Sequence, residues 1–170
     1  MKKVVVIGPE CTGKSTLTEA LALHFNCPYL KEYAREHIAQ LSGPYSPKDI
    51  LEIAKRQIEI EKTIPTNSPY VFLDTDLIVC KVWSEFKYGI CDPWILEQIQ
   101  ARHYDYYLLC DVDLLWNNDG MREHPNQRKE LLAIYEKELK ALNKPYTLIS
   151  GRNRTQMAID TVKRLSLIHI

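Results

Sequence analysis

Eight residues close to the N-terminus have the types and spacing of a phosphate-binding loop. The segment Gly8-Pro9-Glu10-Cys11-Thr12-Gly13-Lys14-Ser15 matches the pattern G-x-x-x-x-G-K-[ST]. In such a loop the glycines let the backbone curl, so that successive N–H groups and the positive end of the following helix face phosphate oxygens. Lys14 is expected to reach the β- and γ-phosphates, and the Ser15 hydroxyl is expected to bind Mg²⁺. We therefore predict that the segment from Gly8 to Thr16 binds ATP with Mg²⁺.

Two carboxylates, Asp74 and Asp76, follow the apolar run from Tyr70 to Leu73. A carboxylate that closes a strand beside a phosphate loop can hold Mg²⁺ or a water bound to it, and this is the role predicted for Asp74. Asp76 lies two residues further on, where it can face the same cleft. The alternative for Asp76 is that it only caps the helix that follows.

A further polar group, Glu32, Tyr33 and Arg35, follows the short segment Tyr29-Leu30. One interpretation is an ordinary surface helix that carries an ion pair. The other is an acceptor site, in which Glu32 holds or deprotonates a sugar hydroxyl while Tyr33 and Arg35 contact a heterocycle or a phosphate. The residues alone leave both interpretations open.

The stretch from residue 113 to 128 is polar and rich in Asn, Asp and Gly, a composition typical of a mobile lid. Phosphoryl transfer spreads negative charge over oxygens, and arginines such as Arg122 and Arg128 can neutralise that charge when a lid closes and excludes water. The alternative is a solvated loop with incidental charges. Trp83 and Trp116 either stack on a flat ring of a ligand or belong to the core.

Five apolar runs have the length and composition of buried strands. They are Val4 to Ile7, Tyr29 to Leu30, Tyr70 to Leu73, Tyr106 to Cys110 and Pro145 to Ile149. Apolar residues at helical spacing predict helices in segments 15–25, 32–36, 50–58 and 77–86. This alternation predicts an α/β fold with a parallel sheet, right-handed crossovers and ligands at the carboxyl ends of the strands.

The composition narrows the class of protein. The chain has 170 residues with 22 basic and 22 acidic side chains, which suits one domain and gives no overall charge for binding nucleic acid or an anionic membrane. Neither a membrane-spanning run nor a signal peptide is recognised, so we expect a cytoplasmic protein. The five cysteines lack the paired spacing of a disulfide frame or zinc site and are expected to be reduced.

The last residues differ in character from the rest. Residues 165–170, Leu-Ser-Leu-Ile-His-Ile, carry no helix stop signal and resemble a translated sequencing adapter. We therefore expect a single domain over residues 1–165 and a non-native tail over 165–170. The alternative is a genuine hydrophobic C-terminal tail. The oligomeric state does not follow from the sequence.

Taken together, these motifs resemble the ribosylnicotinamide kinase domain of NadR-type proteins, within the P-loop kinase superfamily and an AAA_28-like ATPase family. The likeness covers nearly the whole chain and rests on residues 8–16, 32–36, 72–76 and 116–122, followed by Arg128. It implies a three-layer α/β/α P-loop NTPase fold like that of nucleoside monophosphate kinases, with a five-stranded parallel sheet in the order 2-3-1-4-5 and a lid. Cys11 and Asn117-Asn118 depart from the family pattern, so the electrostatics of the lid are expected to differ.

The resemblance also implies an activity, the transfer of phosphate from ATP to the 5′-hydroxyl of nicotinamide riboside to give nicotinamide mononucleotide. Lys14 would hold the phosphates, Ser15 and Asp74 would position Mg²⁺, Asp76 or Glu32 would orient or deprotonate the hydroxyl, and Arg122 with Arg128 would stabilise the transferring group. The residues expected to bind the nucleoside are Glu32, Tyr33, Arg35, Asp76, Trp116 and Asp119.

Because the loop begins at Gly8, a stand-alone kinase is expected rather than a fusion. The alternatives are a deoxynucleoside or nucleotide kinase, and a P-loop ATPase or nucleotide-binding regulatory module.

Overall fold

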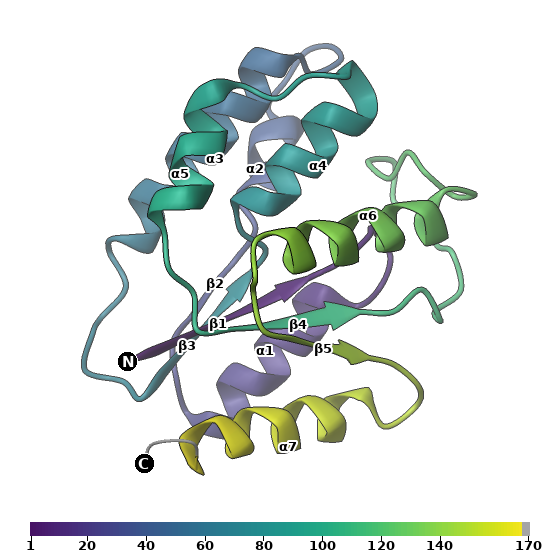
Figure 1. The fold of residues 1–170 in the computed structure, drawn as a ribbon. Helices are drawn as coiled ribbons and strands as arrows, with labels where there is room; N and C mark the ends of the chain where they lie inside the picture. The colour runs from purple at the N-terminus through teal and green to yellow at the C-terminus, as the bar shows by residue number, and fades with distance from the viewer. Residues whose placement is uncertain (168–170) are drawn as a thin grey trace.

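A parallel β-sheet runs through the middle of the computed structural model, which describes residues 1–167 (Figure 1). Its strands are β1 (Lys2–Ile7), β2 (Tyr29–Leu30), β3 (Tyr70–Asp74), β4 (Tyr106–Cys110) and β5 (Tyr146–Ile149). They lie in the order β2-β3-β1-β4-β5, and every neighbouring pair is parallel. The predicted five-stranded parallel sheet and its strand order are therefore confirmed.

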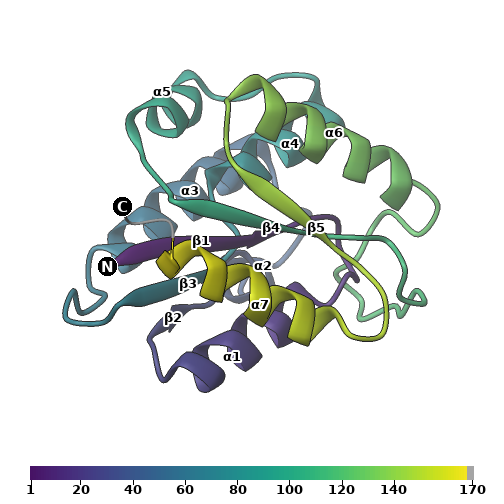
Figure 2. The same cartoon turned by 60° about the horizontal axis from the view of Figure 1, so that its bottom comes forward.

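Helices cover both faces of this sheet (Figures 1 and 2). One layer consists of α1 (Lys14–Phe25) and α7 (Arg154–Leu167). The other layer consists of α2 (Ala34–Ala39), α3 (Pro47–Glu61), α4 (Leu77–Tyr88), α5 (Pro93–Ala101) and α6 (Arg128–Ala141). The helices predicted from periodicity are found, although the one expected from residue 32 begins at Ala34. No range had been predicted for α5, α6 or α7.

The burial of the central strand β1 explains the continuous apolar run in its sequence. The residues from Val4 to Ile7 are fully buried, and they alternate between two hydrophobic clusters. Val5 and Ile7 pack into the cluster beneath α2 to α6, whereas Val4 and Val6 pack into the cluster beneath α1 and α7. A strand that is covered on both faces needs apolar residues at every position.

Local signals set the ends of the helices that border the site. α3 begins with a capping box between Ser46 and Asp49, with proline at its first position. α4 begins at Asp76, whose side chain accepts from the Ile78 N–H, and it ends at Gly89, which has a φ of 72°. The Asp76 cap places the start of α4 just after the carboxyl end of β3.

The C-terminal helix extends further than the predicted domain boundary. α7 continues through Leu167, and the partly buried Leu165 packs against the cluster beneath α1 and α7. That residues 165–170 form a non-native tail stays a prediction, and residues 168–170 lie outside the described part of the chain. Within residues 1–167, no helix is both long enough and apolar enough to span a membrane.

Candidate functional site

The phosphate-binding loop connects β1 to α1, and its backbone is curved before any ligand is considered. Gly8 has a φ of 144°, and a Cβ on it would lie 2.8 Å from the carbonyl oxygen of Cys110. Gly13 and Cys11 also have positive φ values, 77° and 56°. Only glycine fits the close approach at position 8, whereas Cys11 adopts a left-handed conformation that is uncommon for a side chain with a Cβ.

Contacts inside and outside the loop hold this curvature. Inside it, the Thr12 hydroxyl and the Lys14 ammonium both donate to the carbonyl oxygen of Pro9, at 2.7 and 2.8 Å. Outside it, Arg128 donates to the carbonyl oxygen of Cys11 at 3.0 Å, and Arg154 donates to that of Thr12 at 2.6 Å. With its carbonyls engaged on the outside, the loop keeps its N–H groups for the inner side, as an anion-binding nest requires.

Arg154 was not predicted from the sequence. It opens α7 directly after the end of β5, and its guanidinium forms an ion pair with Asp113 in the segment after β4. The only available signal was its place after a strand end, the position at which ligand-binding residues of parallel sheets collect. Arg154 therefore joins the phosphate loop to the C-terminal ends of β4 and β5.

Ser15 and Asp74 form an oxygen-rich pair at the end of β3. The Ser15 hydroxyl donates to Oδ2 of Asp74 at 2.5 Å. Oδ1 of Asp74 has no hydrogen-bond partner in the described part of the chain, although the side chain is buried. Burial raises the pKa of Asp74, and the nearby Ser15 hydroxyl and Lys14 ammonium oppose that rise. A buried carboxylate oxygen without a partner, beside a serine hydroxyl, fits the hard oxygen ligands that Mg²⁺ prefers.

Glu32 lies across the same cavity from the loop, just before α2. Its side chain is 21% exposed, and its carboxylate lies 3.9 Å from the Arg35 guanidinium. Burial raises the pKa of Glu32, and the positive charge of Lys14 opposes this rise. A carboxylate with a raised pKa at the edge of a phosphate-binding cavity is suited to accept a proton near neutral pH.

Asp76 has a different environment. Its side chain is buried, and its two oxygens accept from the Ile78 N–H at 3.0 Å and from the Tyr107 hydroxyl at 2.7 Å. Burial raises its pKa to about 6. It is not among the residues that line the cavity. These contacts are those of a helix cap anchored to β4, the alternative that the sequence had left open.

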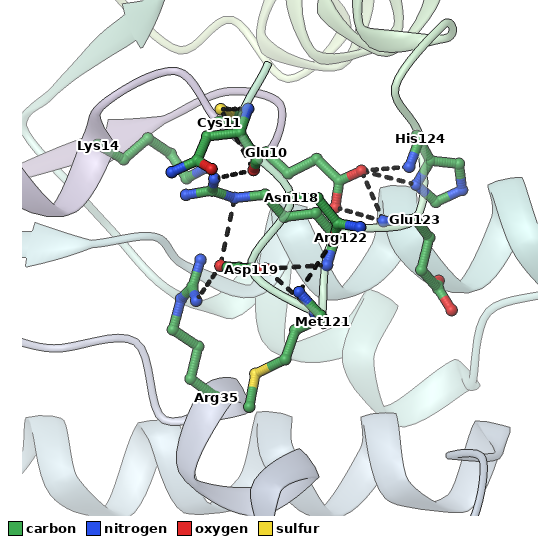
Figure 3. A network of polar contacts seen from close by, with 12 residues as sticks. Glu10, Cys11, Lys14, Arg35, Asn118, Asp119, Met121, Arg122, Glu123 and His124 are labelled. Atoms are coloured by element: carbon green, nitrogen blue, oxygen red, sulfur yellow. Dashed lines mark hydrogen bonds and ion pairs between the residues drawn. The ribbon is translucent and has the colours of Figure 1, made fainter.

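The predicted lid, residues 113–128, connects β4 to α6 and lies over the phosphate loop (Figure 3). Arg35 donates to Asp119 Oδ2 at 2.7 Å, and Arg122 Nε lies 3.3 Å from the same oxygen. The Arg35 guanidinium lowers the pKa of Asp119 to about 2. Asp119 therefore connects the lid to α2 through Arg35, while its contact with Arg122 stays within the lid.

The aromatic and cationic residues predicted in the lid take separate positions. Arg122 lines the cavity and donates to the carbonyl oxygen of Asn117, while its Nε forms no hydrogen bond within the described residues. The Arg128 guanidinium lies 5.5 Å from the centre of the Trp116 ring and outside the cavity lining. Trp116 thus stacks on an arginine. Tyr33 also lies outside the lining, with its N–H donating to Gln57.

The cavity has a volume of about 230 Å³ and two different walls. The phosphate loop, Glu32, Arg35 and Arg122 form the polar wall. The opposite wall is apolar and aromatic, and most of it was not predicted; it includes Ile38, Tyr45, Val79, Val82, Trp83, Phe86, Leu131 and Tyr135. Trp83 had been considered for ring stacking, and the structure places it in this wall. Volume and lining together fit a flat ring attached to a polar group.

The sequence of the chain is similar to those of known proteins. The family model AAA_28, an AAA domain, matches residues 3–156. The trifunctional NAD biosynthesis/regulator protein NadR of Salmonella typhimurium is 27% identical over 128 residues, which is 72% of this chain and 31% of that protein. The chain therefore spans about a third of the length of that relative.

Solved structures resemble nearly the whole chain in fold. The crystal structure of NadR protein in complex with NR superposes with a TM-score of 0.78 at 25% identity, covering 99% of this chain and 52% of that one. Thymidylate kinase from Ehrlichia chaffeensis superposes with a TM-score of 0.68 at 15% identity over 96% of this chain and 98% of its own, a likeness of fold. Since the family model spans residues 3–156, the chain belongs to the AAA_28 family of AAA domains.

Proposed function

We propose that the protein is a phosphotransferase that moves the γ-phosphate of ATP to a hydroxyl group of a small nucleoside. The observation that carries this proposal is the common cavity: Lys14, Ser15 and Glu32 all line it, so a phosphate on the loop and a hydroxyl beside Glu32 would lie in the same cavity. Holding the two reacting groups side by side favours transfer between them.

The side chains support a division of labour. Lys14 and the loop N–H groups hold the phosphates, while Ser15 and Asp74 hold Mg²⁺, which neutralises charge on the phosphate oxygens when it is bound. Glu32 accepts the proton of the acceptor hydroxyl as the oxygen attacks. Arg122 stabilises the charge on the transferring group, and Arg128 keeps the loop in shape through the Cys11 carbonyl. Asp76 keeps α4 in place, so we favour Glu32 over Asp76 as the base.

Charge pairing favours a nucleoside over a nucleotide as the acceptor. Of the residues that line the cavity in the described part of the chain, the two arginines share the carboxylate of Asp119. A phosphate on the acceptor would need a free cation, because a buried anion without a partner is costly. The acceptor side instead offers the carboxylate of Glu32, whereas that of Glu123 is paired with Lys87.

Nicotinamide riboside is the acceptor that we propose. Support comes from the likeness to the NadR structure in complex with NR. The aromatic rings of Tyr45 and Trp83 offer a flat heterocycle apolar surface to pack against. The carboxylate of Glu32, which lines the same cavity, is favourable for a positively charged pyridinium ring.

One assay tests the proposal. The protein is incubated with ATP and Mg²⁺ and, separately, with nicotinamide riboside, deoxyadenosine, thymidine and thymidylate, and acceptor-dependent release of ADP is measured. We expect the largest stimulation with nicotinamide riboside and a phosphorylated product identified by mass. Stimulation by thymidylate alone would indicate a nucleotide kinase. ADP release that is independent of every acceptor would indicate an ATPase or a regulatory module.

A further inference from the structure

The side chain of Glu10 connects the phosphate loop to the lid. Its Oε1 accepts a hydrogen bond from the Glu123 N–H at 3.0 Å and another from the His124 N–H (Figure 3). The His124 ring nitrogen Nδ1 lies 3.4 Å from the same oxygen. The carboxylate of Glu10 thus accepts from two backbone N–H groups of a distant segment, because Glu10 and Glu123 are 113 positions apart in the sequence. Carboxylates that accept from backbone N–H groups form strong, charge-assisted bonds.

The side chain of Glu123 points away from Glu10 and binds the opposite wall of the cavity. The Tyr45 hydroxyl donates to its Oε2, and the Lys87 ammonium donates to Oε1 at 2.9 Å. Lys87 also lies 3.7 Å from the centre of the Tyr45 ring. Glu123 is therefore bound to the phosphate loop through its backbone and to the acceptor wall through its carboxylate.

Tyr45 is itself held rigidly within that wall. Its hydroxyl accepts from Trp83 Nε1 at 2.7 Å, and its carbonyl oxygen accepts from the Tyr88 hydroxyl at 2.8 Å. Burial, together with the hydrogen bond to Glu123, raises the pKa of Tyr45 to about 12, so the hydroxyl remains a donor at neutral pH. Tyr45 and Trp83 both line the cavity, and a ligand that fills the apolar side touches this assembly directly.

We propose that Tyr45, Glu123 and Glu10 form a latch through which the acceptor wall holds the lid closed over the phosphate loop. All three are positioning residues, because they act on nucleotide binding by fixing the lid that carries Arg122. This inference rests on the proposed function only in taking a nucleotide as the ligand of the loop. Because coupling is reciprocal, an acceptor that stiffens Tyr45 raises nucleotide affinity, and a bound nucleotide raises acceptor affinity.

The substitution Tyr45→Phe tests the latch without any acceptor. It removes one hydroxyl outside the phosphate loop, and we expect the Kd for the ATP analogue AMP-PNP with Mg²⁺, measured by calorimetry, to rise about 5-fold. We also expect faster hydrogen exchange of the Glu123 and His124 backbone amides, because their closed state is less populated. Tyr146→Phe is the matched control, since it removes a tyrosine–glutamate hydrogen bond of 2.6 Å between β5 and α6. A Tyr45→Phe protein that matches wild type in both measurements would overturn the proposal.

Two substitutions at Glu10 separate the latch from a general loss of structure. Glu10→Ala removes the acceptor oxygens and should speed amide exchange at residues 123 and 124. Glu10→Gln keeps an acceptor oxygen and should restore most of the protection. Equal exchange in all three proteins would contradict the latch. If wild type does not bind AMP-PNP, the proposed function fails, while the exchange experiment still decides on the latch.

Discussion

Ser15 in α1 and Asp74 at the end of β3 are joined by a hydrogen bond of 2.5 Å across 59 residues of sequence. The second oxygen of Asp74 is buried and has no hydrogen-bond partner in the described part of the chain. Such an oxygen costs about 1–3 kcal/mol relative to one that is satisfied. The ligand-free fold therefore keeps an unfavourable group at the point where a cation would remove the cost.

Replacing Asp74 with Asn should separate activity from stability. Because burial raises the pKa of Asp74, ionisation is favoured in the unfolded chain, so this group lowers stability as the pH rises. We expect Asp74→Asn to raise the free energy of unfolding without Mg²⁺ at pH 7 by about 1 kcal/mol and to lower kcat/KM by about 10²-fold. Thermal unfolding and Mg²⁺ titrations measure both. Asp160→Asn on the exposed face of α7 is the control, and a less stable Asp74→Asn protein would contradict the account.

Glu32→Gln should slow the chemical step. A glutamine cannot accept the acceptor proton, and we expect the single-turnover rate to fall by about 10²-fold with little change in nucleotide affinity. Because the pKa of Glu32 is raised by burial, the wild-type rate should fall as the pH drops through a value above the usual range for glutamate. The variant should lack that dependence. Glu36→Gln, an exposed change in α2, should behave as wild type.

Asp76→Ala should affect folding more than catalysis. The substitution removes the α4 cap and leaves the buried Tyr107 hydroxyl without its partner, and the two losses together are expected to cost about 2–4 kcal/mol. Denaturant unfolding measures this loss. Asp76→Asn should retain most of the stability, because its carbonyl oxygen can accept from the Ile78 N–H and its amide N–H can donate to the oxygen of the Tyr107 hydroxyl.

Asp76 should also make the free energy of unfolding depend on pH. The pKa of Asp76 is raised to about 6 in the folded protein, so the folded state binds more protons than the unfolded state between about pH 4 and pH 6. Stability should therefore fall as the pH rises through this window and then level off. Asp76→Asn should flatten the curve in this range, and an unchanged slope would show that other groups titrate there.

Arg122→Lys should lower kcat more than it raises the KM for ATP. The guanidinium lines the cavity and is oriented by the Asn117 carbonyl and by Asp119, a fork that a lysine ammonium cannot reproduce. We expect kcat to fall by about 10- to 100-fold. Arg152→Lys, an exposed substitution in the loop before α7, provides the control. An equal loss in both variants would point to overall charge as the cause.

The sequence predicted the fold because the rules that it obeys are local. Continuous apolar runs indicate strands buried on both faces, and polar residues at their ends indicate ligand contacts. Asp74 and Glu32 were found in this way, and Lys14 and Ser15 were found from the loop motif. The structure brings all four around one cavity or next to it.

Asp74 and Asp76 could not be distinguished in this way. Thr75 between them has a φ of 73°, a left-handed conformation that is uncommon for a residue with a branched Cβ. This turn directs Asp76 into the core beneath α4, whereas Asp74 stays at the loop. The pattern of residue types carries no signal for such a backbone reversal.

Most residues of the apolar wall, and Arg154, were not predicted because their contacts join parts of the chain that are far apart in the sequence. Tyr45 contacts Glu123 across 78 residues, and Arg154 contacts Thr12 across 142. Helical spacing identifies Val82 and Trp83 as parts of an amphipathic helix but does not tell which of them faces a ligand. Only the packing of α4 against α3, α5 and α6 decides that.

Arg128 and Arg154 donate hydrogen bonds to the carbonyl oxygens of Cys11 and Thr12 and so order the phosphate loop in the folded protein. Since the loop is already ordered, its conformational entropy is lost during folding and not when the nucleotide arrives. The phosphates therefore meet an ordered loop, and the loop itself needs no rearrangement when a nucleotide enters. Differences in affinity between nucleotides then arise from how long each one stays.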